Sequence, residues 1–395
     1  MKKSLLTGLA LLALSALPAS AASFETCLAS IRVRAAAAGV SPAVFDRQTT
    51  GLQADMSVLD QMNKQPEFKT PIWDYMAGLV DAQRVADGKQ MLSKWGSVLS
   101  GVQRRYGVDP AVVVAVWGVE SNYGESQGTR PLVQSLATLS CYAGGRARYF
   151  ESELIATMKI IQNGDIDPAH LVGSWAGAFG QTQFMPSTFL RSAVDGDGDR
   201  RRDIVDSVPD ALASTANYLA KSGWQSGGRW GYEVRLPGNF RAALAGRTKK
   251  RALSSWAAMG VAKVDGSPLQ GGDARAAILL PAGPQGPAFV VFRNFDVIYS
   301  YNAAESYALA IAHLSDRIKG GAPFVTPWPT DDPGLSRAQR KELQALLTRR
   351  GYDVGTPDGS IGNKTIDAIK DAQHRLGLPV TGHPGVQILT ALRKG

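Results

Sequence analysis

The chain has 395 residues, 44% of them hydrophobic and 19% charged, which excludes an intrinsically disordered protein and favours two or three folded domains. The formal net charge is +9, and the basic residues are spread along the chain rather than gathered in long clusters. A diffuse positive charge suits an anionic surface such as a cell wall, and we expect no nucleic-acid partner.

The N-terminus has the features of a secretory signal peptide over residues 1–21. Lys2 and Lys3 precede an apolar stretch from Leu5 to Leu17 that is short for a membrane span, and residues 19–21 form an A-x-A cleavage site. The first cysteine after that site is Cys27, six residues downstream, which argues against lipid anchoring. We therefore expect an exported, soluble protein of the periplasm with no membrane anchor.

The sequence contains two cysteines, Cys27 and Cys141. An oxidising compartment favours one disulfide between them, and two separate thiols are the alternative.

Helical periodicity dominates the main domain, which we place at residues 22–320. We predict helices over residues 25–38 and 41–49, two or three more between residues 71 and 107, and another that ends at Gly223. Residues 227–300 contain more glycine, proline and β-type runs, and they predict a small sheet or loop insertion. Residues 321–334 are rich in proline and glycine and predict a linker, followed by a small domain at residues 335–395.

The stretch AVVVAVWGVESNYG, residues 111–124, ends an apolar helix on a single acid. Asp109 is a favourable N-cap and Pro110 suits the first helical position, so the helix is predicted to run to about Glu120. The helix C-terminus and the apolar turns before it both disfavour a carboxylate anion and raise its pKa. Glu120 is therefore a candidate general acid for glycoside cleavage, and a surface glutamate at a frayed helix end is the alternative.

A second stretch, GSWAGAFGQTQFMPSTF at residues 173–189, mixes small residues with amide, hydroxyl and aromatic groups. Sugar-binding sites combine flat apolar faces with such donors, and Ser174, Gln183 and Phe184 are the candidates here. A tight loop that packs helices together is the alternative reading of this stretch alone.

Together the two stretches closely resemble the lytic murein transglycosylases of the membrane-bound B type, here in a soluble form. The later stretches AVDGDGDRRRDIVDSVPDALASTANYLAKSGW and YSYNAAESYALAIAHLSDRI continue the resemblance, which covers about residues 24–320. It implies a mainly α, lysozyme-like catalytic domain with a substrate groove. It also implies that Glu120 is the single catalytic acid/base and that the groove is lined by Ser174, Gln183, Phe184, Tyr218, Tyr301 and Asn302, with Tyr75 as a weaker candidate.

The resemblance also implies a reaction that needs one carboxyl group, and none of these motifs contains a second one. Most glycosidases use two carboxyl groups, and substrate-assisted enzymes are the exception. Glu120 would protonate the oxygen between N-acetylmuramic acid and N-acetylglucosamine. It would then take a proton from the C6 hydroxyl of the muramic residue, which closes a 1,6-anhydro ring. A muramidase that admits water and a non-catalytic wall-binding scaffold are the alternatives.

The segment DGDGDRRRDIVD, residues 195–206, is spaced like a calcium-binding loop. The expected ligands are Asp195, Asp197, Asp199, the carbonyl group of Arg201, and Asp206. Two departures from the pattern are Arg200 at the usual glycine position and the short side chain of Asp206. The resemblance implies that a structural calcium can bind here with a further acid downstream, for which Asp210 is the candidate. We expect no cofactor to be required for the chemistry and regard a structural calcium as an open possibility, with a solvated Asp/Gly turn as the alternative.

The last 60 residues resemble the small three-helix peptidoglycan-binding domain. The resemblance rests on LQALLTRRGYDVGTPDGSIGNKTIDAIKDAQHRLGLPVTG, residues 343–382, and above all on its PDGSIGNKT turn. It departs from the pattern at Ala372, where an aromatic residue is more usual. The partners this implies are peptidoglycan glycan strands, and cell-wall synthases or amidases are further candidates.

Overall fold

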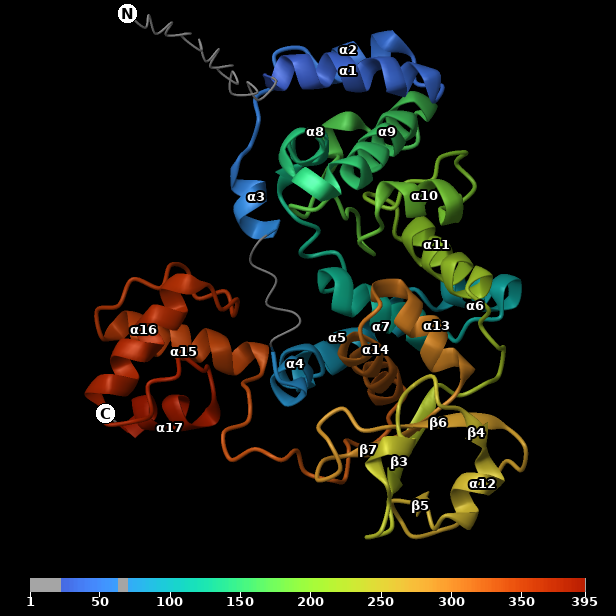
Figure 1. The fold of residues 1–395 in the computed structure, drawn as a ribbon, viewed down its shortest axis with the longest axis vertical. Coiled ribbons are helices and arrows are strands. Elements are labelled where there is room, and N and C mark those ends of the chain that lie inside the picture. Colours follow the sequence, from blue (N-terminus) through green and yellow to red (C-terminus); the bar gives the residue numbers. More distant parts are fainter. Residues whose placement is uncertain (1–22, 63–69, 395) are drawn as a thin grey trace, which may run out of the picture.

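The computed structural model describes residues 23–62 and 70–394, and these residues form a mainly helical protein with two small sheets (Figure 1). The expected signal peptide lies outside the described residues. No helix in the described ranges is long and apolar enough to span a membrane. The prediction of a mainly α catalytic domain followed by a small three-helix domain is confirmed.

One helical layer packs the N-terminal helices against the middle of the chain. Its core contains buried residues of α1, α2, α8, α9 and α10, and Phe45, Phe150 and Phe189 are among the fully buried side chains. The helices of this layer are α1 (Phe24–Ala37), α2 (Pro42–Thr49), α3 (Ser57–Met62), α8 (Leu132–Tyr142), α9 (Ala147–Asn163) and α10 (Pro186–Ser192).

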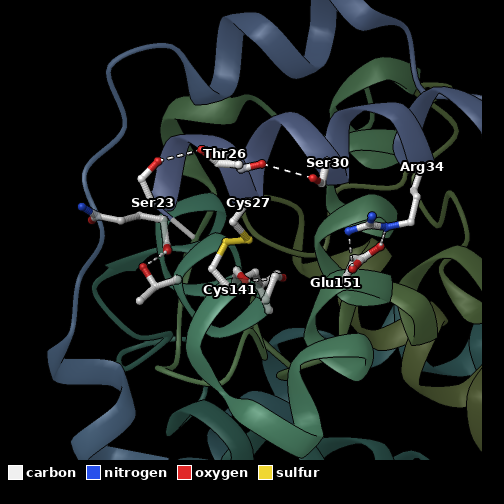
Figure 2. Close-up of a disulfide and its surroundings, with 11 residues drawn as sticks. Ser23, Thr26, Cys27, Ser30, Arg34, Cys141 and Glu151 are labelled. Carbon is white, nitrogen blue, oxygen red and sulfur yellow. Dashed lines mark hydrogen bonds and ion pairs between the residues drawn. A yellow bond between two sulfur atoms is a disulfide. The ribbon is translucent and has the colours of Figure 1, made fainter. Parts of the chain in front are cut away.

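A disulfide between Cys27 and Cys141 joins α1 to α8, as Figure 2 shows, and it confirms the predicted pairing. It links positions 114 residues apart. On the same face of α1, the guanidinium group of Arg34 forms an ion pair with Glu151 of α9. Because these contacts join α1 to two helices of the layer, the N-terminal segment is fixed to the catalytic domain.

A second core surrounds the apolar helix α7, which lies near the centre of the catalytic domain (Figure 1). Every residue of α7 from Ala111 to Gly118 is buried, so the helix has no polar face over that length. It packs against α5, α11 and α14. The helices of this layer are α4 (Ile72–Leu79), α5 (Ala82–Lys94), α6 (Gly96–Tyr106), α7 (Pro110–Ser121), α11 (Val208–Lys221), α13 (Arg293–Asn302) and α14 (Glu305–Ile318).

The predicted insertion is a five-stranded antiparallel sheet in the order β4-β6-β7-β3-β5, covered by α12 (Leu253–Ala258). Tyr232 pairs with Val290 across β3 and β7, and Ile278 pairs with Val290 across β6 and β7. The strands are β3 (Gly231–Arg235), β4 (Arg251–Ala252), β5 (Ala262–Lys263), β6 (Arg275–Leu279) and β7 (Ala288–Val291), and a separate antiparallel pair is formed by β1 (Arg130–Pro131) and β2 (Val172–Gly173).

The C-terminal domain consists of α15 (Arg337–Arg349), α16 (Asn363–Arg375) and α17 (Val386–Lys394) around a core of leucine and isoleucine side chains. Ala372 is 2% exposed, so the departure noted in the sequence is a packing change in this core. Gln344 and Gln373 are buried, and their side-chain oxygens accept hydrogen bonds from the backbone of the turns at Gly359 and Gly382. These two glutamines therefore fix the long connections of the domain.

The segment expected to be a linker lies against the catalytic domain. The buried carboxylate of Glu233 accepts hydrogen bonds from the backbone nitrogens of Val325 and Thr326, at 2.7 and 2.8 Å. Phe324 stacks on His313 with ring centroids 3.7 Å apart. These contacts fix the segment to β3 and α14, and the chain then continues to the C-terminal domain beside α4 (Figure 1).

Candidate active site

The position of Glu120 follows from how α7 begins and ends. Asp109 accepts a hydrogen bond from the backbone nitrogen of Ala111 at 2.9 Å and caps the helix, as predicted. The helix ends at Asn122, whose φ of 53° is left-handed. Glu120 is thus in the last turn, at the point where the buried helix reaches the surface, and most of the residue is buried while a smaller part stays accessible. This is the environment that the sequence predicted for a protonated acid.

Two neighbouring effects set the proton affinity of Glu120. Burial raises its pKa to about 7, and a hydrogen bond from the Tyr307 hydroxyl to Oε1 partly opposes that rise. Tyr307 is 2% exposed and comes from α14, which packs along α7. A carboxyl group with a pKa near 7 is suited to both donate and accept a proton at neutral pH. Sequence reasoning missed Tyr307, although it lies in a stretch that carries the family resemblance.

An aromatic cluster lies next to this acid. The rings of Tyr218 and Tyr301 have centroids 4.9 Å apart, and Tyr301 stacks on Tyr307 at 6.3 Å. The Tyr301 hydroxyl donates to the backbone oxygen of Thr182 at 2.7 Å, and burial together with the nearby charge of Glu120 raises its pKa. Tyr301 therefore joins the acid to the loop at residues 173–189.

Phe184 is placed below these tyrosines rather than on the open surface. Its ring lies 5.9 Å from Tyr218 and 5.8 Å from Tyr301, and the residue is 2% exposed. We expected its ring to contact a sugar, but in this structure it supports the two tyrosines from the core side.

The loop at residues 173–189 is rigidly tied to the end of α7. The Ser121 hydroxyl donates to the backbone oxygen of Gln181 at 2.5 Å. Gln183 has a φ of 50°, and its side-chain nitrogen donates to the backbone oxygens of Gln127 and Gly180 at 3.0 and 2.7 Å. The structure therefore agrees with the tightly packed loop, and contact of its polar groups with a sugar stays a prediction.

The remaining predicted groove residues are Ser174, Asn302 and Tyr75. The Ser174 hydroxyl accepts a hydrogen bond from the backbone nitrogen of Ala178 at 3.0 Å, which stabilises the tip of the loop. Asn302 is exposed at the end of α13, next to Tyr301. Tyr75, in α4, lies close enough to Tyr307 to contribute to the rise in the pKa of that tyrosine. The weaker candidate is thus near the acid.

A cavity of about 200 Å³ opens beside Glu120, and residues of both domains form its walls. The catalytic domain contributes residues that flank the end of α7, and the C-terminal domain contributes the start of α15 and the turn after Asp358. No motif in the sequence indicated that the small domain reaches the acid. The lining residues are Arg84, Val119, Glu120, Ser121, Asn122, Ser126, Arg337, Arg340, Asp358, Gly359 and Ser360.

The predicted calcium loop brings three of its carboxylates together. One oxygen each of Asp195, Asp197 and Asp199 lies within 4.8 Å of the others, an arrangement that suits a hard cation. Asp206 does not face this cluster, because its carboxylate pairs with Nδ1 of His170 at 2.6 Å. The expected role of Asp206 as a ligand is therefore not supported by the geometry.

Asp210, the further acid that the resemblance implied, binds the backbone of the same loop. Its two carboxylate oxygens accept hydrogen bonds from the backbone nitrogens of Gly196 and Asp203, at 2.7 and 2.6 Å. Burial raises its pKa to about 6, and the charges of Asp197 and Asp195 add to the rise. The acid at the start of α11 therefore supports the loop from inside.

Comparison with known proteins agrees with this architecture. Residues 23–316 match the family model described as the transglycosylase SLT domain, and residues 336–392 match that of a peptidoglycan binding domain. Membrane-bound lytic murein transglycosylase B of Escherichia coli (strain K12) is 31% identical over 256 residues, which are 65% of this chain and 70% of that protein.

Two solved structures extend the comparison to three dimensions. SltB3 from Pseudomonas aeruginosa, in complex with NAG-anhNAM-pentapeptide, is 46% identical with a TM-score of 0.76, over 94% of this chain and 99% of that chain. The Escherichia coli lytic transglycosylase Slt35, in complex with calcium, is 28% identical with a TM-score of 0.65, over 74% of this chain and 92% of that chain. The chain therefore belongs to the lytic transglycosylase family of the SLT domain, and its catalytic domain is followed by a domain of the peptidoglycan-binding family.

Proposed function

We propose that this protein is an exported lytic transglycosylase that cleaves the bond between N-acetylmuramic acid and N-acetylglucosamine and leaves 1,6-anhydro ends. The observation that carries the proposal is the carboxyl group of Glu120, whose pKa of about 7 keeps much of it protonated at neutral pH. A relative of this fold, SltB3, was solved with a NAG-anhNAM-pentapeptide, a compound that contains the anhydro sugar. The family, the acid and the related complex all favour the same chemistry.

The proposed reaction uses one acid twice. Glu120 donates its proton to the glycosidic oxygen, and the bond from that oxygen to C1 of the muramic residue breaks. The acetamido oxygen of that residue stabilises the positive charge that develops at C1. The C6 hydroxyl then attacks C1 and gives its proton to the Glu120 carboxylate, which restores the acid. Because the nucleophile belongs to the substrate, no water is consumed.

The hydrolytic alternative has one candidate for a second carboxylate. Asp358 of the C-terminal domain lines the same cavity as Glu120. Its Oδ1 accepts a hydrogen bond from the backbone nitrogen of Ser360 at 2.7 Å, which holds its pKa below the ordinary value. An ionised carboxylate that stabilises its own turn in this way is poorly suited to a general base.

The proposed function is tested by the products released from purified cell walls. We expect the wild type to release fragments one water lighter than reducing ends. The variant Glu120→Gln should lose at least about 100-fold in rate, while Glu25→Gln, on the surface of α1, should match the wild type. Asp358→Asn should still give anhydro products.

Two other outcomes would support the rivals. Reducing ends from the wild type, together with complete loss of cleavage in Asp358→Asn, would favour a hydrolytic muramidase. Wall binding without release of fragments, equal in the wild type and Glu120→Gln, would favour a non-catalytic scaffold.

The proposal also includes a periplasmic location for the protein and a structural calcium ion. A periplasmic location rests on the signal-like N-terminus and on the chemistry of a cell-wall substrate. Calcium bound by Asp195, Asp197 and Asp199 rests on their convergence and on a relative that was solved with calcium. Such an ion would fix the loop before α11 and take no part in the reaction. Cell-wall synthases and amidases stay predictions as protein partners.

A further inference from the structure

Three arginines from two domains surround the cavity that contains Glu120. Arg84 belongs to α5, whereas Arg337 and Arg340 belong to the start of α15. Arg340 lies so close to Gly78 that a Cβ atom at that glycine would be 2.9 Å from Nη1. The backbone oxygen of Gly78 also accepts a hydrogen bond from Nη1 of Arg84 at 3.2 Å. The guanidinium groups of Arg84 and Arg340 therefore meet over the same end of α4.

These positive charges have few direct partners. Among the described residues, Arg84 and Arg340 take part in no ion pair, and Arg337 lies 3.9 Å from the exposed Glu125. Arg84 is only 8% exposed, and the Nε atoms of Arg84 and Arg340 are buried without a hydrogen-bond partner. Burial lowers the pKa of both side chains, and the charge of Arg337 adds to the fall, while the carboxylate of Asp81 partly opposes it. Buried guanidinium groups in this state favour the entry of an anion.

The acids nearest to the cluster are engaged elsewhere. Asp81 accepts one hydrogen bond from the backbone nitrogen of Arg84 at 2.8 Å and another from that of Arg337 at 3.1 Å. Asp358 accepts its hydrogen bond from the backbone nitrogen of Ser360. These carboxylates reduce the net charge of the region, but neither forms an ion pair with an arginine of the cluster. Nη1 of Arg84 donates to the backbone oxygens of Gly78 and Leu79, and its Nη2 donates to Oδ1 of Asn122. The donors left for a ligand are therefore mainly those of Arg337 and Arg340.

We propose that this arginine cluster binds a carboxylate of the peptide stem that the muramic residue carries, next to the bond that Glu120 cleaves. The inference rests on the proposed function and names a further part of its substrate. The N-acetylated sugars of the glycan are neutral, and the acidic groups of peptidoglycan lie on the stems. Since the stem is attached to the muramic residue, its carboxylates stay close to the sugar that is bound next to Glu120. Guanidinium groups are the preferred partners of carboxylates because they offer paired donors in one plane.

The cluster also assigns a role to the C-terminal domain in substrate selection. The carboxylate of Asp81 caps α5 and also binds the first residue of α15. One side chain therefore holds both arginine-bearing helices in position. The site is complete only when the C-terminal domain is docked on α4 and α5.

The test compares three forms of the same glycan with the full-length enzyme. One form has intact stems, the second has stems whose carboxylates are amidated, and the third has no stems and has its lactyl carboxyl groups converted to amides, so that it carries no charge. We expect the wild type to prefer the first form over the other two in kcat/KM, by about tenfold. Arg340→Gln should reduce that preference to near unity, and Arg340→Lys should retain part of it. The matched control is Arg349→Gln, an exposed position at the end of the same helix, which should keep the wild-type preference.

A second measurement separates binding from docking. Proteolysis within residues 321–334 reports release of the C-terminal domain, and we expect the same rate in both Arg340 variants as in the wild type. Equal cleavage of the three glycans by the wild type, or an unchanged preference in Arg340→Gln, would overturn the inference. Faster proteolysis in step with the loss of preference would also overturn it, because Arg340 would then have only a structural role. A wild type that cleaves none of the three would instead refute the proposed function, and the site with it.

Discussion

The hydroxyl of Tyr307 donates a hydrogen bond to Oε1 of Glu120, although 187 residues separate the two along the chain. The bond favours the ionised carboxylate, whereas burial at the end of α7 favours the neutral acid. The balance leaves a pKa of about 7, above the 4.5 of an ordinary glutamate but low enough for the group to ionise at neutral pH. A residue that must release a proton and then recover it needs this intermediate affinity.

The pH dependence of cleavage should report the state of Glu120. The first step needs the protonated acid, so kcat/KM should fall as the pH rises through about 7. The measurement is the initial rate of fragment release from a soluble glycan at low substrate concentration, over the pH range in which the enzyme stays folded. A decline centred near pH 4.5, the ordinary value for a glutamate, would contradict the assigned environment.

Removing the Tyr307 hydroxyl should shift this profile in a defined direction. The hydrogen bond lowers the pKa of Glu120, so Tyr307→Phe should raise that pKa and move the alkaline limb to higher pH. The variant should also be slower, because the carboxylate that accepts the proton from the C6 hydroxyl loses a donor. Tyr299→Phe, a change on the neighbouring helix α13, is the control and should leave the limb in place. A shift to lower pH in Tyr307→Phe would show that the bond does not stabilise the anion.

Protein stability should depend on pH through the same group. The pKa of Glu120 is raised from 4.5 to about 7 on folding, so its contribution to stability is fully present below about pH 4.5 and is lost as the pH rises through 7. One pKa unit corresponds to 1.36 kcal/mol, and the loss is on the order of 3 kcal/mol. Glu120→Gln does not titrate and should escape it.

Urea unfolding at pH 4.5 and pH 8 tests this linkage. The difference in unfolding free energy between Glu120→Gln and the wild type should move in favour of the variant by up to about 3 kcal/mol between the two pH values. Comparing the two proteins isolates Glu120 from Asp210, whose raised pKa contributes equally to both. A difference that is the same at both pH values would contradict the raised pKa.

Calcium should stabilise the loop before α11 if the three converging aspartates bind it. Added calcium should raise the Tm of the wild type, and a chelator should reverse the rise. Asp197→Asn should abolish the response, because its carboxylate belongs to the cluster. Asp206→Asn should keep it, since Asp206 faces His170 instead. Loss of the response in both variants would restore the ligand set that the sequence predicted, and no shift in the wild type would exclude the metal.

Much of the fold was predictable because its signals are local. Asp109 and Pro110 start α7, Asn122 ends it, and an unbroken apolar run between them indicates a helix buried on all sides. These features predict that Glu120 lies in the last turn of the helix and that its pKa is raised. The disulfide between Cys27 and Cys141 was predictable because the sequence predicts export to an oxidising compartment, which favours pairing of its two cysteines.

The rest depends on contacts between distant segments. In the sequence, Tyr307 looks like an ordinary core residue of an apolar helix. Its role becomes visible only from the packing of α14 against α7, which brings its hydroxyl to Glu120. The arginine cluster needs α5 and α15 to meet, and no periodicity in either helix indicates that Asp81, the N-cap of α5, also binds the first residue of α15. The segment before α15 has the composition of a free linker, although it is docked on the catalytic domain. Glu233 binds its backbone nitrogens, and such contacts require no particular side chain in the segment.

The central claim is that Glu120 transfers a proton while the substrate supplies its own nucleophile. Digestion of purified cell walls in ¹⁸O-labelled water tests this most directly, with the mass of each muramic end as the readout. We predict unlabelled ends that are one water lighter than reducing ends, and none from Glu120→Gln under the same conditions. Labelled reducing ends as the main product, or anhydro ends formed as fast by Glu120→Gln as by the wild type, would contradict the account.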